Sequence, residues 1–453
     1  MQSQLEKNQE VLITIKNLGI NGEGIGYYKR QAVFVDGVFP PEEVVVKITS
    51  IHRGYAVGEV VRIKKRAFYR ERPFCKHYGT CGGCQLQHIK YEEQLRLKED
   101  MLKQTFDRYT NVDLNKVKFH TFAPVIRPRY YRHKASMPVR NTTKGLVTGL
   151  YKKGSNDLVD VLECPVQDRR INQINQRVLE LCDEYEIYAF DPKEMRGLLR
   201  YIVTRVSSFN ETIQVTLVVT IFNKALIPLA HKIKELPSVE SVAISKNHDA
   251  KNHEIFGDTF EILAGEDTIM ESVGNVKFAL NPKAFFQLNP EEAEKMYNYV
   301  GTLFDKKEES LLDLYTGSGA MALYFADQFK TVFGVDQSKA SIDSANHNKQ
   351  LNNIKNAHFT EGDAYESVQK LYDKGFNFDV VVFDPPRSGL DDKMIDLLLR
   401  KPIKKLIYVS CNPSTLAKNI KALSRKYNVK SVMPFDMFPQ TSHIESVTLL
   451  ELK

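Results

Sequence analysis

One cysteine near the C-terminal end of the chain occupies a position from which a thiol could act as a nucleophile. Residues 405–409 (KLIYV) are an apolar run typical of a buried strand, and the chain then breaks at Asn412 and Pro413. The thiol of Cys411 is therefore expected at the carboxyl edge of that strand, where open α/β sheets bind their ligands. On its own, a cysteine here is more often a small apolar residue that closes a core strand. The motifs that accompany it favour the nucleophile.

A glycine-rich turn between a predicted strand and a predicted helix indicates a nucleotide-type cofactor. From Gly317 the sequence has G-x-G-x-x-A spacing, which lets the backbone approach a ligand closely, and the next strand ends in Asp336, whose carboxylate can accept ribose hydroxyls. NAD and S-adenosylmethionine (SAM) both fit these features. Asp363 after a third strand and Asp384 at the end of a fourth favour SAM, although either aspartate alone is more typical of a solvated turn.

Three cysteines within ten residues predict a metal site. Cys75, Cys81 and Cys84 form this trio, a fourth candidate, Cys164, lies far downstream, and all-sulfur ligation suits zinc or an iron–sulfur cluster. Zinc fingers prefer two separate cysteine pairs, so the clustered trio favours a 4Fe–4S cluster, with zinc as the alternative. Six cysteines in all are too few for a disulfide scaffold in a chain of this length.

The composition is that of an ordinary soluble globular protein with two or three domains. Of the 453 residues, 42% are hydrophobic and 26% charged, and the sequence has neither a signal peptide nor an apolar run of membrane length. We therefore expect a cytoplasmic protein without membrane contact, and a monomer.

The net charge of +7 is unevenly distributed along the chain. Residues 127–153 contain eight Lys or Arg and no Asp or Glu, and aromatic rings interleave these cations. Cations mixed with flat rings suit phosphates and unstacked bases, so RNA is the expected partner, with a solvated basic face as the alternative. The candidate RNA contacts are Arg129, Arg132 and Lys134.

The pattern of predicted strands and helices divides the chain into three domains. Residues 1–66 have short strands and glycine-rich turns, which predict a small barrel, and their order resembles the TRAM domain, an OB-like RNA-binding barrel. Residues 67–278 are expected to form a mostly β central domain that carries the metal and faces RNA, although the helix predicted at 91–109 could pack on the catalytic domain. Residues 279–453 alternate strands and helices, which predicts a Rossmann-like α/β domain.

Several short motifs occur together with the barrel and the cysteine trio. They are Tyr131-Arg132-His133-Lys134, Cys164-Pro165-Val166, Phe285-Phe286-Gln287, Asp384-Pro385-Pro386-Arg387, Ser410-Cys411-Asn412-Pro413 and His443-Ile444-Glu445-Ser446-Val447. This set resembles the bacterial RNA uracil-C5 methyltransferases over nearly the whole chain, and is most similar to the Gram-positive branch that acts on 23S ribosomal RNA. The resemblance implies a class I SAM-dependent methyltransferase domain, methylation of uridine C5 in RNA, and a 4Fe–4S cluster.

The resemblance also implies roles for individual residues. Cys411 would be the nucleophile and Glu445 the base that removes a proton. One departure is visible, because the family often has Ser-His where this chain has Ser155-Asn156-Asp157; it bears on a base contact by histidine there and not on the chemistry. The implied SAM contacts are Gln287, Tyr315, Asp336 and Asp384, joined by Gly317 and Asp363 from the cofactor motifs, and the implied cluster ligands are Cys75, Cys81, Cys84 and Cys164.

The chemistry of uracil agrees with these roles. C5 is too poor a nucleophile to attack a sulfonium methyl group, but a thiolate that adds at C6 makes C5 enolate-like, and a base must then remove the C5 proton. The target should be an unstacked uridine, in a single-stranded loop or flipped out of a helix. The alternatives are methylation of tRNA, a cytosine-C5 enzyme, which would carry an extra cysteine in the Asp-Pro-Pro motif, and an RNA-binding protein without activity, which would not bind SAM.

Overall fold

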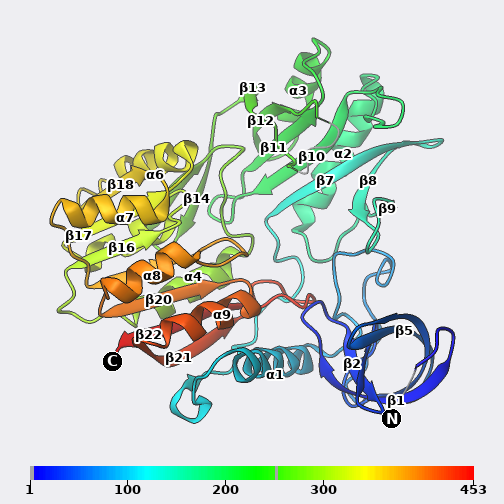
Figure 1. Cartoon of the computed structure of the whole chain (residues 1–453). Helices are drawn as coiled ribbons and strands as arrows, with labels where there is room; N and C mark the ends of the chain where they lie inside the picture. The colour runs from blue at the N-terminus through cyan, green and yellow to red at the C-terminus, as the bar shows by residue number, and fades with distance from the viewer. Residues whose placement is uncertain (1–4, 250–253) are drawn as a thin grey trace.

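The computed structural model describes residues 5–249 and 254–453, and three β-sheet units dominate it (Figure 1). A closed five-stranded barrel is followed by a seven-stranded sheet and an eight-stranded sheet, with a separate two-stranded hairpin. Within the described residues no helix is both long enough and apolar enough to cross a membrane.

The N-terminal barrel has the strand order β1-β2-β3-β5-β4. Apolar residues alternate along its strands, so that Val11, Ile13 and Ile15 face the closed interior. The glycine-rich segment, expected to be a turn, also contributes a strand that begins at Gly24. Only glycine fits at this position, because a side chain there would meet the carbonyl oxygen of Val38 at 2.5 Å. The strands are β1 (Glu10–Leu18), β2 (Gly24–Tyr28), β3 (Gln31–Val35), β4 (Glu43–His52) and β5 (Tyr55–Lys65).

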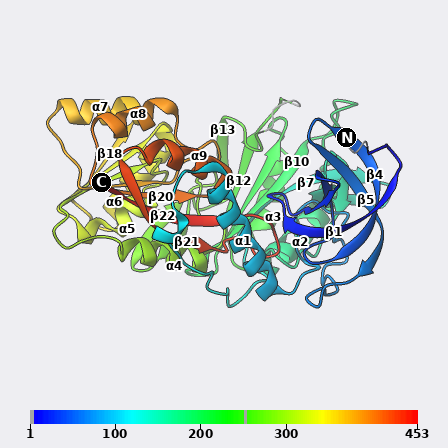
Figure 2. The same ribbon diagram turned by 60° about the horizontal axis from the view of Figure 1, so that its bottom comes forward.

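Residues 91–119 join the C-terminal domain and not the central sheet. The predicted helix is present as α1 (Tyr91–Tyr109), and its apolar residues enter the core beneath α9 (Pro413–Leu423). After the short 3-10 helix η1 (Leu114–Lys116), the two-residue strand β6 (Lys118–Phe119) adds to the edge of the eight-stranded sheet, parallel to β21. Figure 2 shows α1 lying between the barrel and that sheet. The sequence pattern does not indicate β6.

The central domain is a seven-stranded sheet in the order β13-β12-β11-β10-β7-β8-β9. Its core is closed by two helices, and Cys182 is fully buried in the first of them. The strands are β7 (Lys134–Thr142), β8 (Gly145–Tyr151), β9 (Leu158–Asp160), β10 (Leu199–Val206), β11 (Ile213–Val219), β12 (Val239–Lys246) and β13 (Thr259–Gly265), and the helices are α2 (Arg169–Glu184) and α3 (Leu226–Lys234).

The C-terminal sheet has the order β18-β17-β16-β19-β20-β22-β21-β6, and its first five strands are parallel. Strands β19 and β20 are buried along their whole length, as expected for strands covered by helices on both faces. The strand order reverses between β16 and β19, and open α/β sheets generally bind ligands at the carboxyl ends of the strands at such a point. The hairpin β14 (Ile269–Val273) and β15 (Val276–Leu280) packs into the same core.

The remaining elements alternate as the sequence pattern predicts. The strands are β16 (Ser310–Leu314), β17 (Thr331–Asp336), β18 (Ala357–Glu361), β19 (Val380–Phe383), β20 (Lys405–Ser410), β21 (Tyr427–Phe435) and β22 (Glu445–Leu452). The helices are α4 (Pro290–Gly301), α5 (Ala320–Tyr324), α6 (Lys339–Leu351), α7 (Ala364–Asp373) and α8 (Asp392–Arg400), with a 3-10 turn η2 (Ala326–Gln328).

Candidate active site

Cys411 and Glu445 lie opposite each other where two neighbouring strands meet. Strand β20 pairs antiparallel with β22, and the last pair in the register is Ser410 with Ser446. One further step along the same register places Cys411 opposite Glu445, and directly opposed residues have Cα atoms about 4.5–5.5 Å apart. The thiol is half-buried, whereas Glu445 is buried and its Oε1 has no hydrogen-bond partner. An unpaired buried carboxylate oxygen beside a thiol is costly unless a ligand completes it.

Asp384 and Arg387 approach the same point from the end of β19. Phe383 pairs with Tyr408 on β20, so Asp384 follows at the carboxyl edge beside the strand that carries the cysteine. The backbone carbonyl of Arg387 accepts hydrogen bonds from Asn412 Nδ2 at 3.1 Å and from Thr415 Oγ1 at 3.0 Å. These two bonds connect the Asp-Pro-Pro-Arg loop to the residues that follow the cysteine.

The electrostatics of the site favour protonated acids before substrate binds. The pKa of the Cys411 thiol is raised to about 11, mainly by burial and also by the Glu445 and Asp384 carboxylates, while Arg387 opposes the shift. Burial also raises the pKa of Glu445 well above its usual range; Asp384 adds to this shift and Arg387 opposes it. The pKa of Asp384 is likewise raised by burial. Arg387 is thus a cation that favours both the thiolate and the ionised base, and sequence reasoning assigned it no role in the site.

The predicted cofactor loop follows β16 and has a strained, open backbone. Tyr315, a non-glycine residue, has φ 65°, and Gly317 has φ 55°. Such values in a tyrosine persist only where surrounding structure enforces them, and they cluster at ligand sites. Asp336, at the end of β17, accepts hydrogen bonds from the backbone N–H of Gly317 at 3.0 Å and of Ser338 at 2.8 Å. A side chain added at Gly317 would meet no atom within 4 Å, so the space above the loop is open.

Buried polar residues behind the loop hold it in place, and sequence reasoning missed them. Asp313 accepts hydrogen bonds from Thr316 Oγ1 at 2.6 Å and from the N–H of Ala322 at 3.0 Å, and burial raises its pKa to about 7. Asn348 on α6 donates to the carbonyl of Ser318 at 3.2 Å. An aspartate inside the otherwise apolar run of β16 is a signal that could have identified the first of these residues.

The two remaining predicted cofactor residues lie on loops at the edges of this region. Asp363 is exposed and caps α7, accepting a hydrogen bond from the N–H of Glu366 at 3.1 Å. Gln287 is half-buried, two residues before Asn289, which caps α4. The positions of Gln287 and Asp363 do not test the cofactor contacts expected of them, so both contacts stay predictions.

Comparisons with known proteins agree with this arrangement. A model of the tRNA (uracil-5-)-methyltransferase family matches residues 90–453, more than half of the chain, and a model of the TRAM domain matches residues 4–61. The chain belongs to the tRNA (uracil-5-)-methyltransferase family. The resemblance to RNA uracil-C5 methyltransferases and to the TRAM domain is thereby confirmed. The family match begins at α1, which agrees with the packing of that helix on the C-terminal sheet.

Relatives and a solved structure align along almost the entire methyltransferase. An uncharacterized RNA methyltransferase of Bacillus anthracis is 38% identical over 458 residues, covering 100% of this chain and 99% of the relative. One of Listeria monocytogenes serotype 4b is 38% identical over 459 residues with the same coverage. The structure of the Pyrococcus abyssi tRNA (uracil-54, C5)-methyltransferase in complex with S-adenosyl-L-homocysteine has a TM-score of 0.76 at 27% identity, covering 96% of this chain and 98% of the other.

The four predicted cluster cysteines of the methyltransferase surround one cavity. Cys75, Cys81, Cys84 and Cys164 all line a space of about 140 Å³, together with Tyr131. Across the described ranges, no group of three or more His, Cys, Asp or Glu side chains could hold a metal ion, so a bound metal is not supported and the 4Fe–4S cluster stays a prediction. Burial raises the pKa of Cys84 to about 12, and the neighbouring thiols Cys164, Cys81 and Cys75 add to the shift.

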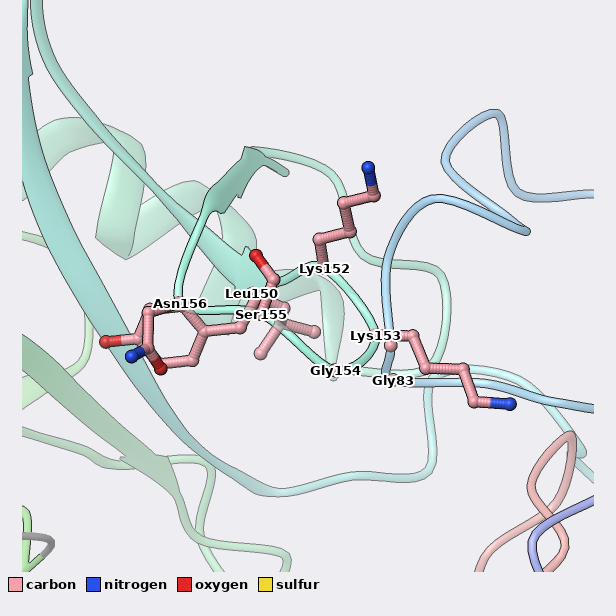
Figure 3. Close-up of a pocket in the computed structure, with 9 residues that line it drawn as sticks. Gly83, Leu150, Lys152, Lys153, Gly154, Ser155 and Asn156 are labelled. Carbon is pink, nitrogen blue, oxygen red and sulfur yellow. The ribbon is translucent and has the colours of Figure 1, made fainter. Parts of the chain in front are cut away.

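A second, open cavity lies beside residues 75–89, called the cysteine segment from here on (Figure 3). Its volume is about 620 Å³, and its wall joins Gly82 and Gly83 to the turn between β8 and β9. The N–H of Gly82 donates to the carbonyl of Tyr151 at 3.0 Å, which ties the two segments together. Asn156, in the segment that departs from the family pattern, lies on this wall, and Lys153 reaches the barrel through an ion pair with Asp36 at 2.7 Å.

The three candidate RNA contacts differ in their surroundings. The guanidinium of Arg129 lies 3.8 Å from the ring centre of Phe74, and Arg132 donates through Nε to the carbonyl of Lys134 at 3.0 Å. Lys134 is half-buried; burial, Arg205 and Arg132 lower its pKa to about 6. A cation in such surroundings is stabilised when an anion approaches, which is compatible with a phosphate contact.

Proposed function

We propose that the methyltransferase transfers the methyl group of SAM to C5 of a uridine in RNA. The observation that supports this most directly is the opposition of the Cys411 thiol and the Glu445 carboxylate, with an unpartnered oxygen on Glu445. A thiol and a base on the same edge match the two demands of the reaction, one at C6 and the other at C5 of the same pyrimidine ring.

In the proposed reaction, each bond that forms is matched by a bond that breaks. The thiolate of Cys411 forms an Sγ–C6 bond, and the electron pair of the C5–C6 double bond moves toward C5 and O4. C5 would then bond to the methyl carbon of SAM as the bond between that carbon and the sulfonium sulfur breaks, which leaves S-adenosyl-L-homocysteine. Glu445 takes the proton from C5, the electron pair of that C–H bond restores the C5–C6 double bond, and the Sγ–C6 bond breaks to release the thiolate.

The residues of the cofactor loop fit SAM. The open space above Gly317 and the carboxylate of Asp336 beneath it suit a nucleoside with ribose hydroxyls. In this proposal Tyr315 and Gln287 flank the ligand, Asp363 lies toward its base, and Asp384 lies between the ligand and Cys411. The solved Pyrococcus relative holds S-adenosyl-L-homocysteine, the demethylated form of the same molecule.

We also propose that Cys75, Cys81, Cys84 and Cys164 hold a 4Fe–4S cluster. Four thiols around a cavity of about 140 Å³ suit a bulky cluster better than one ion, which needs its ligands in direct convergence. The cluster would order this RNA-facing segment, because methyl transfer itself consumes no electrons.

The RNA substrate we propose is 23S ribosomal RNA, at an unpaired or flipped uridine. The support is the similarity of the sequence motifs to the Gram-positive 23S branch. A second candidate is a tRNA uridine, because the solved Pyrococcus relative is a tRNA (uracil-54, C5)-methyltransferase. Mapping 5-methyluridine in both RNA classes from a strain that lacks the protein separates the two: loss from 23S RNA supports the first candidate, and loss from tRNA supports the second.

The decisive test of the chemistry is capture of the covalent adduct. With RNA that contains 5-fluorouridine, the proton at C5 is replaced by fluorine, so the final elimination is blocked and the RNA should stay bonded to Cys411. Cys411→Ala should bind SAM but form no adduct and no product, while Cys182→Ala, which removes a buried thiol in α2, should form both. Glu445→Gln should methylate RNA and remain attached to it. An adduct at any other residue, or turnover by Cys411→Ala, would refute the assignment.

A further inference from the structure

The loop that leads into Glu445 is buried, which is unusual for a connection between two strands. Residues 436–444 join β21 to β22, and the Cα partner of Glu445 in the sheet is Phe435, so the loop ends where the base begins. Asp436 and Met437 are at most 1% exposed, and Gln440 is 4% exposed. Buried loops need partners for their polar backbone, and such partners fix their conformation.

Those partners come from distant parts of the chain. The carbonyl oxygen of Gln440 accepts hydrogen bonds from the N–H groups of Gln85 at 3.1 Å and Leu86 at 3.0 Å, in the cysteine segment. The hydroxyl of Tyr131 donates to the carbonyl of Pro439 at 3.0 Å. Two segments that lie outside the C-terminal sheet therefore hold the middle of this loop.

The side-chain amide of Gln94 forms a pair of hydrogen bonds with Gln440 at the centre of the loop, one to its side chain and one to its backbone. Gln94, on α1 and fully buried, donates through Nε2 to Oε1 of Gln440 at 3.0 Å, and its Oε1 accepts from the backbone N–H of Gln440 at 3.2 Å. Gln94 also donates to the carbonyls of Leu86 and Ile89, at 3.1 and 2.8 Å. One amide thus connects α1, the cysteine segment and the loop before the base.

The backbone at Gln440 is in the left-handed region, with φ 72°. A residue other than glycine adopts such a conformation only where its surroundings over-determine it, and the strain costs about 1–3 kcal/mol. The amide pair with Gln94 and the two backbone bonds from the cysteine segment supply that constraint. Without them, the loop would relax, and the start of β22 would turn with it.

We propose that Gln94 and Gln440 are positioning residues for Glu445, and that their amide pair aims the carboxylate at C5 of the uracil ring. The inference rests on the proposed function, because it concerns the removal of the C5 proton. Neither residue contacts Cys411 or the cofactor loop in the described structure. Thiol addition and methyl transfer should therefore be spared when the pair is lost, while elimination should slow.

Gln94→Met tests this proposal, because methionine keeps the length of the side chain and removes the amide. The matched control is Gln104→Met, on an exposed position of the same helix. In single turnover with unmodified RNA, Gln94→Met should transfer the methyl group within about twofold of the wild-type rate but release product about tenfold more slowly. The covalent RNA–protein complex, seen on a denaturing gel, should accumulate about tenfold during turnover. Gln104→Met should match the wild type.

A second variant and a second measurement guard against a simple folding defect. Gln440→Gly accepts the positive φ without strain but lacks the side-chain amide, so its fold should survive while the complex accumulates as in Gln94→Met. SAM affinity, measured by calorimetry, should be unchanged in both variants. Equal slowing of methyl transfer and release, or release at the wild-type rate, would overturn the proposal. Absence of any adduct in the wild type with 5-fluorouridine RNA would instead refute the proposed function itself.

Discussion

Lys98 and Asp436 form an ion pair that is fully buried, and its disruption should be costly. Nζ of Lys98 lies 2.6 Å from Oδ1 of Asp436, and both side chains are 0% exposed. Tyr91 donates its hydroxyl to the other carboxylate oxygen at 2.8 Å. In Lys98→Met the new side chain fills the volume of the lysine stem, so the change removes charge with little loss of packing. Asp436 then keeps the Tyr91 donor and loses its counter-ion.

The expected magnitude follows from the desolvated charge that remains. Removing one partner of a buried ion pair costs about 3–5 kcal/mol of stability. This cost raises the equilibrium constant for local opening of α1 and residues 436–444 by about 150- to 5,000-fold.

Hydrogen exchange read by mass spectrometry measures this opening locally, which matters because a chain of several domains does not unfold in two states. Amides of α1 and of residues 436–444 should exchange faster in Lys98→Met by the factor above. Lys103→Met, at a side chain 46% exposed on the same helix, should change stability by less than about 0.5 kcal/mol. Lys98→Met combined with Asp436→Asn leaves no charge and still accepts the Tyr91 hydroxyl, so it should recover most of the loss. Exchange less than tenfold faster in the single variant, or no recovery in the double variant, would refute the reasoning.

Three further predictions concern the site and the cysteines. The single-turnover rate of adduct formation should rise with pH through the neutral range, because burial raises the pKa of Cys411 to about 11 and the thiolate is the reactive form; a rate that falls with pH would contradict this. Gly319→Ala should weaken SAM binding by about 5- to 30-fold in calorimetry, since φ is 82° and the new Cβ would lie 2.9 Å from Phe359, whereas Gly375→Ala, with φ 87° and open space, should leave SAM affinity unchanged. Anaerobically purified protein should contain iron and sulfide in about equal amounts, and Cys84→Ser should lose both; colourless wild-type protein with zinc would exclude the cluster.

Local sequence patterns predicted the helices and strands whose formation depends on residues close together in the chain. The apolar periodicity of residues 91–109 predicted α1 with the same bounds. The apolar run 405–409 before Cys411 predicted β20, which continues one residue further, to Ser410. These elements were predictable because residues close in the chain determine them.

Contacts between distant segments left no such signal. Strand β6 has only two residues, and its place beside β21 depends on the packing of α1. Gln94 and Gln440 are 346 residues apart, and Lys98 and Asp436 are 338 apart, so no local periodicity relates the members of either pair. A polar residue on the buried face of a helix does predict that some partner exists, because a buried amide or ammonium group must be satisfied. It does not identify that partner, and α1 was accordingly assigned no chemistry.

Because of these distant contacts, the nucleophile and the base are held in place by different parts of the chain. The residues that hold the nucleophile belong to the C-terminal sheet, since Asn412 bonds to the carbonyl of Arg387 and caps α9. The loop before the base is instead held by α1, through Lys98 and Gln94, and by the cysteine segment, through the backbone of residues 85–86. We therefore expect changes in the cysteine segment to affect product release before they affect thiol addition. Such a division gives the cysteine segment influence over the step in which the enzyme and its product separate, although the segment supplies no reacting atom.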